Sequence, residues 1–364
     1  MNTPARHRFF VPGPTEVRPE ILTAMTGPMI PHRSAAFESL YATLQSGLRE
    51  VFGTAEPVIV STSSATGMME AAVRCAPPGA VLALVNGAFS KRFGEIAAAC
   101  GRDAQLLEVP FGQVVALDQL EAALKSRTFS TVLVVHSETS TGARSDIRAV
   151  TDLARRHGAL CLVDSVSGVG GIPLKFDEWD LDFVLTGSQK ALALPPGLAF
   201  AVASKRYMQH AASNPVRGRY LDIAELHAFA VKSSTPATPA LSLMYALKDQ
   251  LEAIRAEGME ERWARHAAMA AAVAEWVAGS QQRVGLELGI LAAPDSRSET
   301  VTAVTLPAHL KGPEIVAAVA RHGYTLGEGY GTLKERTVRI GHMGDHTVAG
   351  LAGLLSAIDE VLRN

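Results

Sequence analysis

The feature that most constrains this fold is an alternation over the first two-thirds of the chain, where short continuous apolar runs are separated by longer stretches of helical period. The runs are rich in β-branched and aliphatic residues, which favour strands. Strands that are apolar throughout are buried on both faces, as in a mostly parallel sheet covered by helices. The sequence therefore predicts a doubly wound α/β domain, with strands at residues 58–61, 80–85, 131–136, 160–164, 183–186 and 198–203.

The pattern changes after Pro239 to two long helical stretches separated by Gly258, and beyond Gly279 short strand-like runs alternate with helices. This predicts a smaller α+β domain. The predicted elements are helices at 241–256, 259–277, 313–322 and 347–362 and strands at 301–306 and 337–340. The expected division of the 364 residues is an N-terminal segment that contacts the active site, a large domain and a small C-terminal domain, at residues 1–19, 20–258 and 259–364.

Charge and hydropathy exclude several classes of protein. Lys and Arg number 34 and Asp and Glu 36, so a net charge of −2 offers no general attraction for nucleic acid or an anionic membrane. No apolar stretch approaches the roughly 18 residues of a membrane span, and no apolar signal region follows Arg6 and Arg8, so the expected location is the cytoplasm. The three widely spaced cysteines (Cys75, Cys100 and Cys161) suit reduced core thiols better than disulfides or a zinc site.

Two ionisable residues stand at the ends of predicted strands, where ligands bind in open parallel sheets. Asp164 ends one apolar run, and a buried carboxylate needs a partner such as a protonated pyridine nitrogen. Lys190 follows the next run inside apolar sequence, and desolvation favours the neutral amine that attacks a carbonyl to form a Schiff base. Alone, Asp164 could equally cap a helix or pair within its loop, and a lone lysine could be solvated. The presence of both residues at consecutive strand ends favours a catalytic site over these structural roles.

A segment of small polar residues, 62–67, leads from the first predicted strand into a helix. Exposed amides at a helix N-terminus can bind phosphate, and the hydroxyls of Ser64 and Thr66 add donors. An ordinary capped helix is the alternative, and the segment matches neither of the common glycine-rich phosphate loops. A lysine, an aspartate and such a helix end are together what pyridoxal 5'-phosphate requires of a protein.

These residues lie in motifs that resemble the fold-type I, class V aminotransferases, near the alanine–glyoxylate and serine–pyruvate aminotransferases. The resemblance covers nearly the whole chain. Its motifs are Phe-Val-Pro-Gly-Pro-Thr at 10–15, Val-Asp-Ser-Val-Ser at 163–167, Gly-Ser-Gln-Lys-Ala at 187–191 with Pro-Pro-Gly at 195–197, and Arg-Ile-Gly at 339–341. The resemblance implies a large domain with a mostly parallel seven-stranded sheet and a small α+β domain. It also implies pyridoxal 5'-phosphate as the cofactor, with Lys190 as the catalytic Schiff-base lysine and Asp164 on the ring nitrogen.

The resemblance also implies further contacts to the cofactor. Phe89 stands where the family commonly has a tryptophan that stacks on the ring, and Thr139 where a hydroxyl approaches the phenolic oxygen. Thr238 stands where a threonine reaches the phosphate of the neighbouring subunit, and Thr235 replaces the tyrosine that accompanies it in some members. The residues implied to bind phosphate within the chain are Ser64, Ala65 (commonly glycine in the family), Thr66 and Gln189.

On the substrate side, the resemblance places the α-carboxylate on Arg339, whose planar fork can hold a carboxylate through two hydrogen bonds, and a further substrate contact on Gly13. The pair His342 and His346 has the i, i+4 spacing of metal ligands. Gly344 lies between them and the surrounding motif of a metal site is missing, so no metal is expected.

The function implied by the resemblance is a ping-pong transamination from alanine or serine to glyoxylate or pyruvate, in a homodimer with shared active sites. Ureidoglycine or pyridoxamine as amino donor remains open. A desulfurase-like lyase would need a cysteine in a mobile loop late in the chain, and the last cysteine here is Cys161. A non-catalytic cofactor-binding protein would tolerate the loss of Lys190 or Arg339, and both are present.

Overall fold

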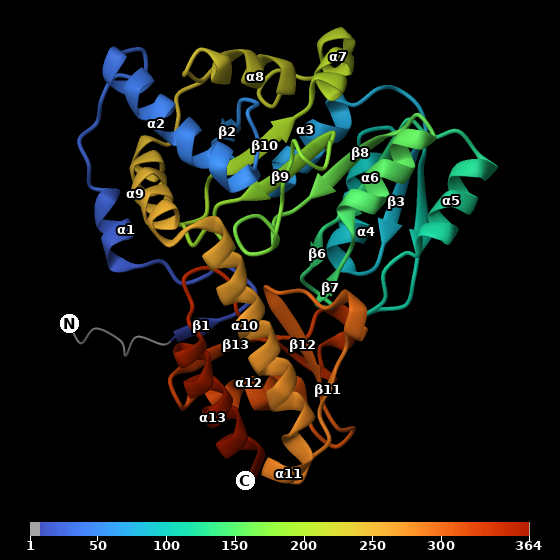
Figure 1. The fold of residues 1–364 in the computed structure, drawn as a ribbon, viewed down its shortest axis with the longest axis vertical. Coiled ribbons are helices and arrows are strands. Elements are labelled where there is room, and N and C mark those ends of the chain that lie inside the picture. The colour runs from blue at the N-terminus through green and yellow to red at the C-terminus, as the bar shows by residue number, and fades with distance from the viewer. Residues whose placement is uncertain (1–7, 364) are drawn as a thin grey trace.

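A computed structural model describes residues 8–363 of the chain, and a seven-stranded sheet lies in the upper part of the molecule (Figure 1). The strand order is β2-β10-β9-β8-β5-β3-β4, and β10 alone runs antiparallel to its neighbours. The strands are β2 (Ile59–Ser61), β3 (Val81–Val85), β4 (Ala104–Glu108), β5 (Thr131–Val135), β8 (Leu160–Asp164), β9 (Phe183–Gly187) and β10 (Ala199–Ala203). The mostly parallel doubly wound sheet predicted from the sequence is confirmed.

Successive side chains of each strand point to opposite faces of the sheet, and each face has its own apolar core. In β3, Leu82 and Leu84 pack in one core, while Val81, Ala83 and Val85 pack in the other. Covering both faces is what makes these strands apolar throughout. The first core contains α2 (Ala35–Phe52), α5 (Leu117–Ser126), α6 (Ile147–Arg156) and α9 (Leu241–Glu257); the second contains α3 (Ala65–Cys75), α4 (Ala88–Ala99), α7 (Lys205–Ser213) and α8 (Ile223–Val231).

A second sheet of five strands, in the order β1-β13-β14-β12-β11, forms the lower part of the molecule (Figure 1). Its strands are β1 (Arg8–Phe10), β11 (Gly289–Ile290), β12 (Val301–Thr305), β13 (Tyr324–Glu328) and β14 (Thr337–Gly341), and the helices of this part are α10 (Met259–Ala278), α11 (Ser280–Val284), α12 (Gly312–Ala320) and α13 (Val348–Arg363). The N-terminal strand β1 pairs in parallel with β13. The chain therefore enters the second sheet first and then crosses to the large sheet through α1 (Pro19–Ala24).

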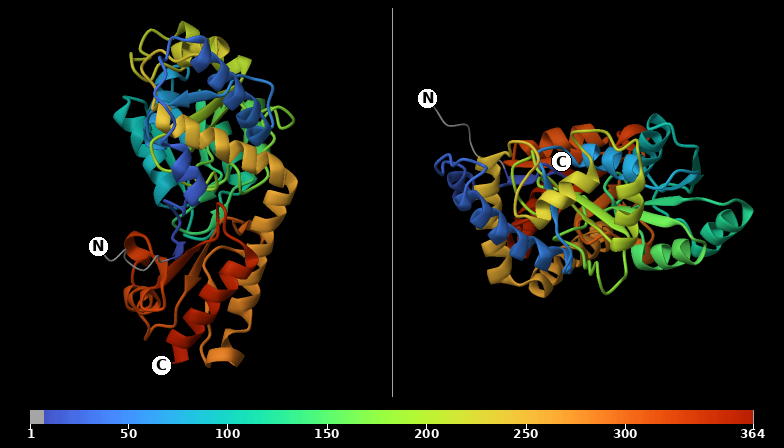
Figure 2. Two further views of the ribbon diagram at one scale, coloured as in Figure 1. Left: turned by 90° about the vertical axis from the view of Figure 1, so that its left-hand side faces the viewer. Right: turned by 90° about the horizontal axis from the view of Figure 1, so that it is seen from above.

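Helix α10 follows α9 after Gly258, whose φ of +86° lets the chain turn between them. Figure 2 shows α10 running from the upper part of the molecule along the whole length of the lower part. The predicted domain boundaries at residues 19 and 258 remain a prediction.

Four strands of the two large sheets were not predicted from the sequence, and one of them, β11, has only two residues. β4 lies at the edge of the large sheet and is half-exposed, so its Ala-Gln-Leu-Leu-Glu sequence lacks a continuous apolar run. β1 is a three-residue edge strand, and β13 runs into the glycine-rich segment 327–331. Between residues 8 and 363, no helix has both the length and the apolarity to cross a bilayer. Arg6, where the sequence was searched for a signal, lies outside the described residues.

Candidate functional site

Asp164 and Lys190 lie at the carboxyl ends of two adjacent parallel strands, β8 and β9. Asp164 is the last residue of β8 and pairs in register with Leu185 of β9. Lys190 follows β9 by three residues, and its Nζ donates a hydrogen bond to the carbonyl of Pro12 from the N-terminal segment. The sheet thus brings together two residues that are 26 positions apart in the chain, as the strand-end argument predicted.

The Asp164 carboxyl is buried, with 2% of the residue exposed. Within residues 8–363 its hydrogen-bond donor is the Val166 amide, at 2.9 Å from Oδ1. Burial is the main cause that raises the pKa of Asp164, to about 7, while the Val166 hydrogen bond and the charge of Lys190 act in the opposite direction. A cationic N–H group next to this carboxyl would favour its charged form, so the site suits a protonated pyridine nitrogen.

The surroundings of Lys190 make its amine easier to deprotonate than an ordinary lysine. Burial and then the positive charge of Arg339 lower its pKa to about 8, and Asp164 opposes them. At pH 7 about a tenth of such an amine is neutral, against well under a thousandth at the ordinary lysine pKa. The chain therefore prepares the nucleophile that a Schiff base requires.

The N-terminal end of α3 adjoins this pair. Ser64 is the N-cap of α3, and its hydroxyl accepts from the Gly67 amide at 3.4 Å. The first amides of a helix have no partner within the helix, so those of Ala65 and Thr66 point out of this end. A Cβ at Gly187 would lie 2.8 Å from the Oε1 of Gln189 and 3.4 Å from the Cβ of Ala65, so the two implied phosphate residues flank one glycine.

The geometry of this helix end fits a phosphate, because its unpaired amides, a hydroxyl and an amide side chain converge there. With Asp164 and Lys190 beside it, the residues present fit pyridoxal 5'-phosphate.

Phe89 is positioned by a buried carboxylate that sequence reasoning did not single out. Glu138, which is fully buried, accepts hydrogen bonds from the Phe89 amide at 3.1 Å, from the Ser90 amide and hydroxyl, and from the Ser140 amide and hydroxyl. These bonds fix the start of α4 and hence the Phe89 ring. The missed signal is similar to the one that selected Asp164, because Glu138 is a carboxylate only three residues beyond the buried strand β5.

The Phe89 ring is bordered by two side chains that sequence reasoning also left out. The Arg92 guanidinium lies over it, 4.9 Å from the ring centroid, and the Tyr330 ring lies 5.6 Å away at 44°. Arg92 also donates to the Tyr330 hydroxyl at 3.2 Å. Since Tyr330 comes from the small-domain sheet, these contacts join the two parts of the molecule at the site.

Arg339 reaches the site from β14. Its Nε donates to the Glu328 carbonyl at 2.7 Å and its Nη1 to the Thr139 carbonyl at 3.2 Å. Burial lowers its pKa. Across residues 8–363 no carboxylate forms an ion pair with Arg339 and no acceptor bonds its Nη2, so the guanidinium is oriented and keeps capacity for an anion.

Two of the implied hydroxyls belong to Thr139 and Thr238, and their contacts to a cofactor stay predictions. The Thr139 hydroxyl lies 2.6 Å from the Ser167 hydroxyl and is buried, so it is already engaged within the chain. Thr238 is exposed in the loop that precedes α9 and lines a small cavity with Thr62, while Thr235 is buried in the same loop with its hydroxyl unpaired. Their reach to a neighbouring subunit stays a prediction.

His342 and His346 have separate partners. His342 Nε2 lies 2.9 Å from the Thr302 hydroxyl, and His346 Nε2 lies 2.8 Å from the Phe9 carbonyl. In the part of the chain that the structure describes, no three His, Cys, Asp or Glu side chains are grouped to hold a metal ion.

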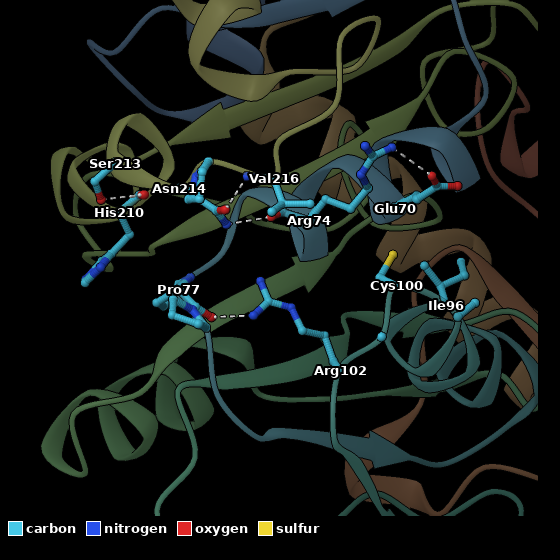
Figure 3. A pocket seen from close by; sticks show the side chains of 14 residues that line it. Glu70, Arg74, Pro77, Ile96, Cys100, Arg102, His210, Ser213, Asn214 and Val216 are labelled. Carbon is cyan, nitrogen blue, oxygen red and sulfur yellow. Dashed lines mark hydrogen bonds and ion pairs between the residues drawn. The ribbon is translucent and has the colours of Figure 1, made fainter.

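A cavity of about 830 Å³ lies away from these residues, at the opposite end of α3 (Figure 3). It is bordered by the Glu70–Arg74 ion pair and by Arg102, which donates to the Pro77 carbonyl at 3.0 Å. The eleven residues of α3 separate its two ends by about 16 Å. The cavity is therefore distinct from the site at Asp164 and Lys190.

Comparison with known proteins places the chain among enzymes of one family. The family model described as "Aminotransferase class-V" matches residues 20–329. The chain is 34% identical to the L-aspartate–glyoxylate aminotransferase of Paracoccus denitrificans, over 97% of this chain and 90% of the relative, and 34% identical to the serine–glyoxylate aminotransferase of Methylorubrum extorquens, over 98% and 91%. The crystal structure of an alanine–glyoxylate aminotransferase from Nostoc sp. superposes with a TM-score of 0.92 at 31% identity, covering 100% of this chain and 97% of that one.

Proposed function

Since the chain belongs to the class V aminotransferases, we propose that it transfers an amino group from alanine or serine to glyoxylate or pyruvate in a ping-pong reaction. The observation that carries the proposal is the meeting of Asp164 and Lys190 at adjacent strand ends, beside the open N-terminal end of α3. The serine–glyoxylate and alanine–glyoxylate activities named for the relatives support the choice of substrates.

The family implies dependence on pyridoxal 5'-phosphate, and we assign its binding to residues of this chain. Lys190 carries it covalently, Asp164 bonds the ring nitrogen, and Phe89 packs on the ring face. Ser64, Ala65, Thr66 and Gln189 receive the phosphate. When bound, the cofactor supplies a ring that withdraws electrons from the substrate's Cα.

Lys190 has two tasks in this proposal. Its amine would hold the cofactor, and the same Nζ, when free, would take up and return the proton at the substrate's Cα. A pKa of about 8 suits a group that must accept and return a proton near neutral pH. Gly13 leaves room for this amine and places the Pro12 carbonyl next to it.

Arg339 orients the substrate. Its guanidinium is fixed by the carbonyls of Glu328 and Thr139, and the capacity that these bonds leave suits the α-carboxylate of an amino or 2-oxo acid. Fixing the carboxylate places the Cα–H bond relative to Lys190, which reduces the entropy that the reaction must overcome.

We extend the proposal to a homodimer in which Thr238 approaches the partner's phosphate site. Thr238 is exposed, and the surface near its loop carries apolar side chains that are unusual in contact with water. Met29 is 69% exposed, Val231 61% and Tyr220 58%. A second copy of the chain would cover them.

A half-reaction screen tests the proposed function. Purified protein loaded with pyridoxal 5'-phosphate is mixed separately with alanine, serine, aspartate, pyridoxamine and cysteine, and the conversion of the cofactor to its amino form is followed by absorbance. Conversion by alanine or serine, together with borohydride trapping of the cofactor on Lys190 by peptide mapping, is the expected result. Preference for aspartate or pyridoxamine, release of sulfide from cysteine, or a label on another lysine contradicts it.

A further inference from the structure

A buried arginine outside the site described above contacts the loops that carry both Asp164 and Lys190. We propose that Arg262 is a positioning residue that fixes the Lys190 loop to the Asp164 loop and ties both to the junction of the two domains. This inference rests on the proposed role of Lys190.

The contacts of Arg262 run to the two loops directly. Arg262 lies in the first turn of α10 and is 2% exposed. Its Nη2 donates to the carbonyl of Ala191, the residue after Lys190, at 2.8 Å. Its Nε donates to the carbonyl of Gly170, in the loop that follows Asp164, at 3.1 Å. One planar group thus bonds both loops and sets the spacing between them.

The other side of the guanidinium is anchored to acidic residues from two further segments. Nη1 donates to Glu257 at the end of α9, at 2.7 Å. Nη2 also bonds Asp345 at 2.9 Å, in the loop between β14 and α13. Asp345 follows β14, the strand that carries Arg339, so Arg262 is linked to the strand that presents the proposed substrate-binding side chain.

The Lys190 loop needs such support because part of its backbone is strained. Ala193 has φ of +51°, a left-handed conformation that an L-residue with a side chain adopts only when the surroundings hold it. The Ala193 amide donates to the Lys190 carbonyl at 2.8 Å, and the Thr15 hydroxyl donates to the same carbonyl at 3.0 Å. The Thr15 amide also donates to the Gln189 carbonyl at 3.0 Å, so with Ala191 held by Arg262 the backbone is fixed on both sides of Lys190.

Arg265 provides a matched control on the same helix. It also pairs with Glu257, at 2.6 Å, and it donates to the carbonyls of Gly344 and His346, but among residues 8–363 no bond joins it to the Lys190 loop. Arg262→Lys and Arg265→Lys therefore make the same chemical change in the same ion-pair network. Only Arg262→Lys removes guanidinium contacts to the carbonyls of Gly170 and Ala191. The fold should survive Arg262→Lys because neither carboxylate loses all of its partners. Glu257 still pairs with Arg265, and Asp345 still pairs with Arg18 at 2.8 Å.

The experiment compares the full-length holoenzymes of the wild type and the two variants. The absorbance of bound pyridoxal 5'-phosphate is titrated with pH, and kcat and KM are measured for the best amino donor from the half-reaction screen. In Arg262→Lys, a looser loop admits water to Nζ, so the titration midpoint should rise by about one pH unit. kcat should fall about tenfold with KM changed less than about twofold, because Arg339 is untouched. Arg265→Lys should match the wild type in both.

The inference would be overturned if folded Arg262→Lys had the wild-type midpoint and kcat. It would also be overturned if Arg265→Lys changed the midpoint and kcat as much as Arg262→Lys does. If Arg262→Lys does not fold, Asp345→Asn replaces it, because this change weakens the anchor of Arg262 while its bonds to Ala191 and Gly170 remain. A smaller upward shift of the midpoint is then expected, and no shift overturns the inference. A wild type without cofactor on Lys190 would instead refute the proposed function.

Discussion

Gly13 lies so close to Lys190 that a Cβ on Gly13 would be 2.5 Å from Nζ and 2.6 Å from Cδ of the lysine. Gly13 also has φ of +105°, where side chains are strained. The N-terminal segment therefore forms one wall of the lysine's pocket, although Gly13 is 177 positions away in the sequence. Only a residue without a side chain leaves the Lys190 amine in this place.

Gly13→Ala should displace the Lys190 amine and reduce the rate of covalent cofactor attachment at least about tenfold. The measurement is borohydride trapping of pyridoxal 5'-phosphate over time, with mass spectrometry of the Lys190 peptide. Gly285→Ala is the control, because Gly285 also has a positive φ, of +71°, but no atom lies within 4 Å of its added Cβ. Equal attachment rates in the two variants would show that the contact with Lys190 is unimportant.

Asp164→Asn should still bind the cofactor and should slow the half-reaction about 100-fold, since an amide cannot hold a proton on the ring nitrogen by charge. Single-turnover absorbance with a saturating amino donor measures this rate. A variant within about twofold of the wild-type rate would mean that Asp164 serves the fold alone.

Arg339→Ala should remove the partner of the α-carboxylate and cost on the order of 2–5 kcal/mol in the half-reaction with amino acids. Amines without a carboxylate should be affected far less, and Arg339→Lys should recover only part of the activity because an ammonium lacks the planar fork. The comparison uses half-reaction rates of each variant with an amino acid and with its decarboxylated amine. Equal losses for both donors would assign Arg339 to support of the small domain.

Glu138→Gln should weaken cofactor binding about tenfold, because an amide NH₂ would face the donors of Phe89, Ser90 and Ser140 and leave buried N–H groups unpaired at about 1–3 kcal/mol each. Spectroscopic titration gives the cofactor Kd, and thermal unfolding gives stability. Glu299→Gln is the control, since Glu299 is a largely buried carboxyl that pairs with Arg144 and does not touch the Phe89 segment. Loss of stability in both variants with unchanged cofactor affinity would contradict the role given to Glu138.

Protonation of His136 should lower the free energy of unfolding as the pH decreases. Burial lowers the folded-state pKa of His136 to about 3, and the unfolded value is near 6.5. The unfolded chain therefore binds more protons below pH 6.5, and the free energy of unfolding falls as pH decreases, by up to about 1.4 kcal/mol per unit for this group. Urea unfolding at pH 7, 6 and 5 should show a shallower decline for His136→Asn than for the wild type. Parallel declines would contradict this prediction.

The sequence by itself determined the elements whose signal is local. Strands buried on both faces, such as β5 and β8, appear as unbroken apolar runs, and α9 and α10 appear as long periodic stretches separated by Gly258. The rule that ligands bind at the carboxyl ends of parallel strands was then sufficient to select Asp164 and Lys190. Edge strands such as β4 escaped because half-exposed strands need no continuous apolar sequence.

Only the tertiary structure decided which distant groups meet these two residues. Gly13 against the Lys190 side chain, Glu138 on the Phe89 amide and Arg262 across the loops after Asp164 and Lys190 are contacts between segments up to 177 positions apart. No periodicity or spacing encodes them, because a buried hydrogen bond depends on where two backbones pass each other in space. The sequence therefore selected the two candidate reacting groups, and the packing between distant segments decided how those groups are held.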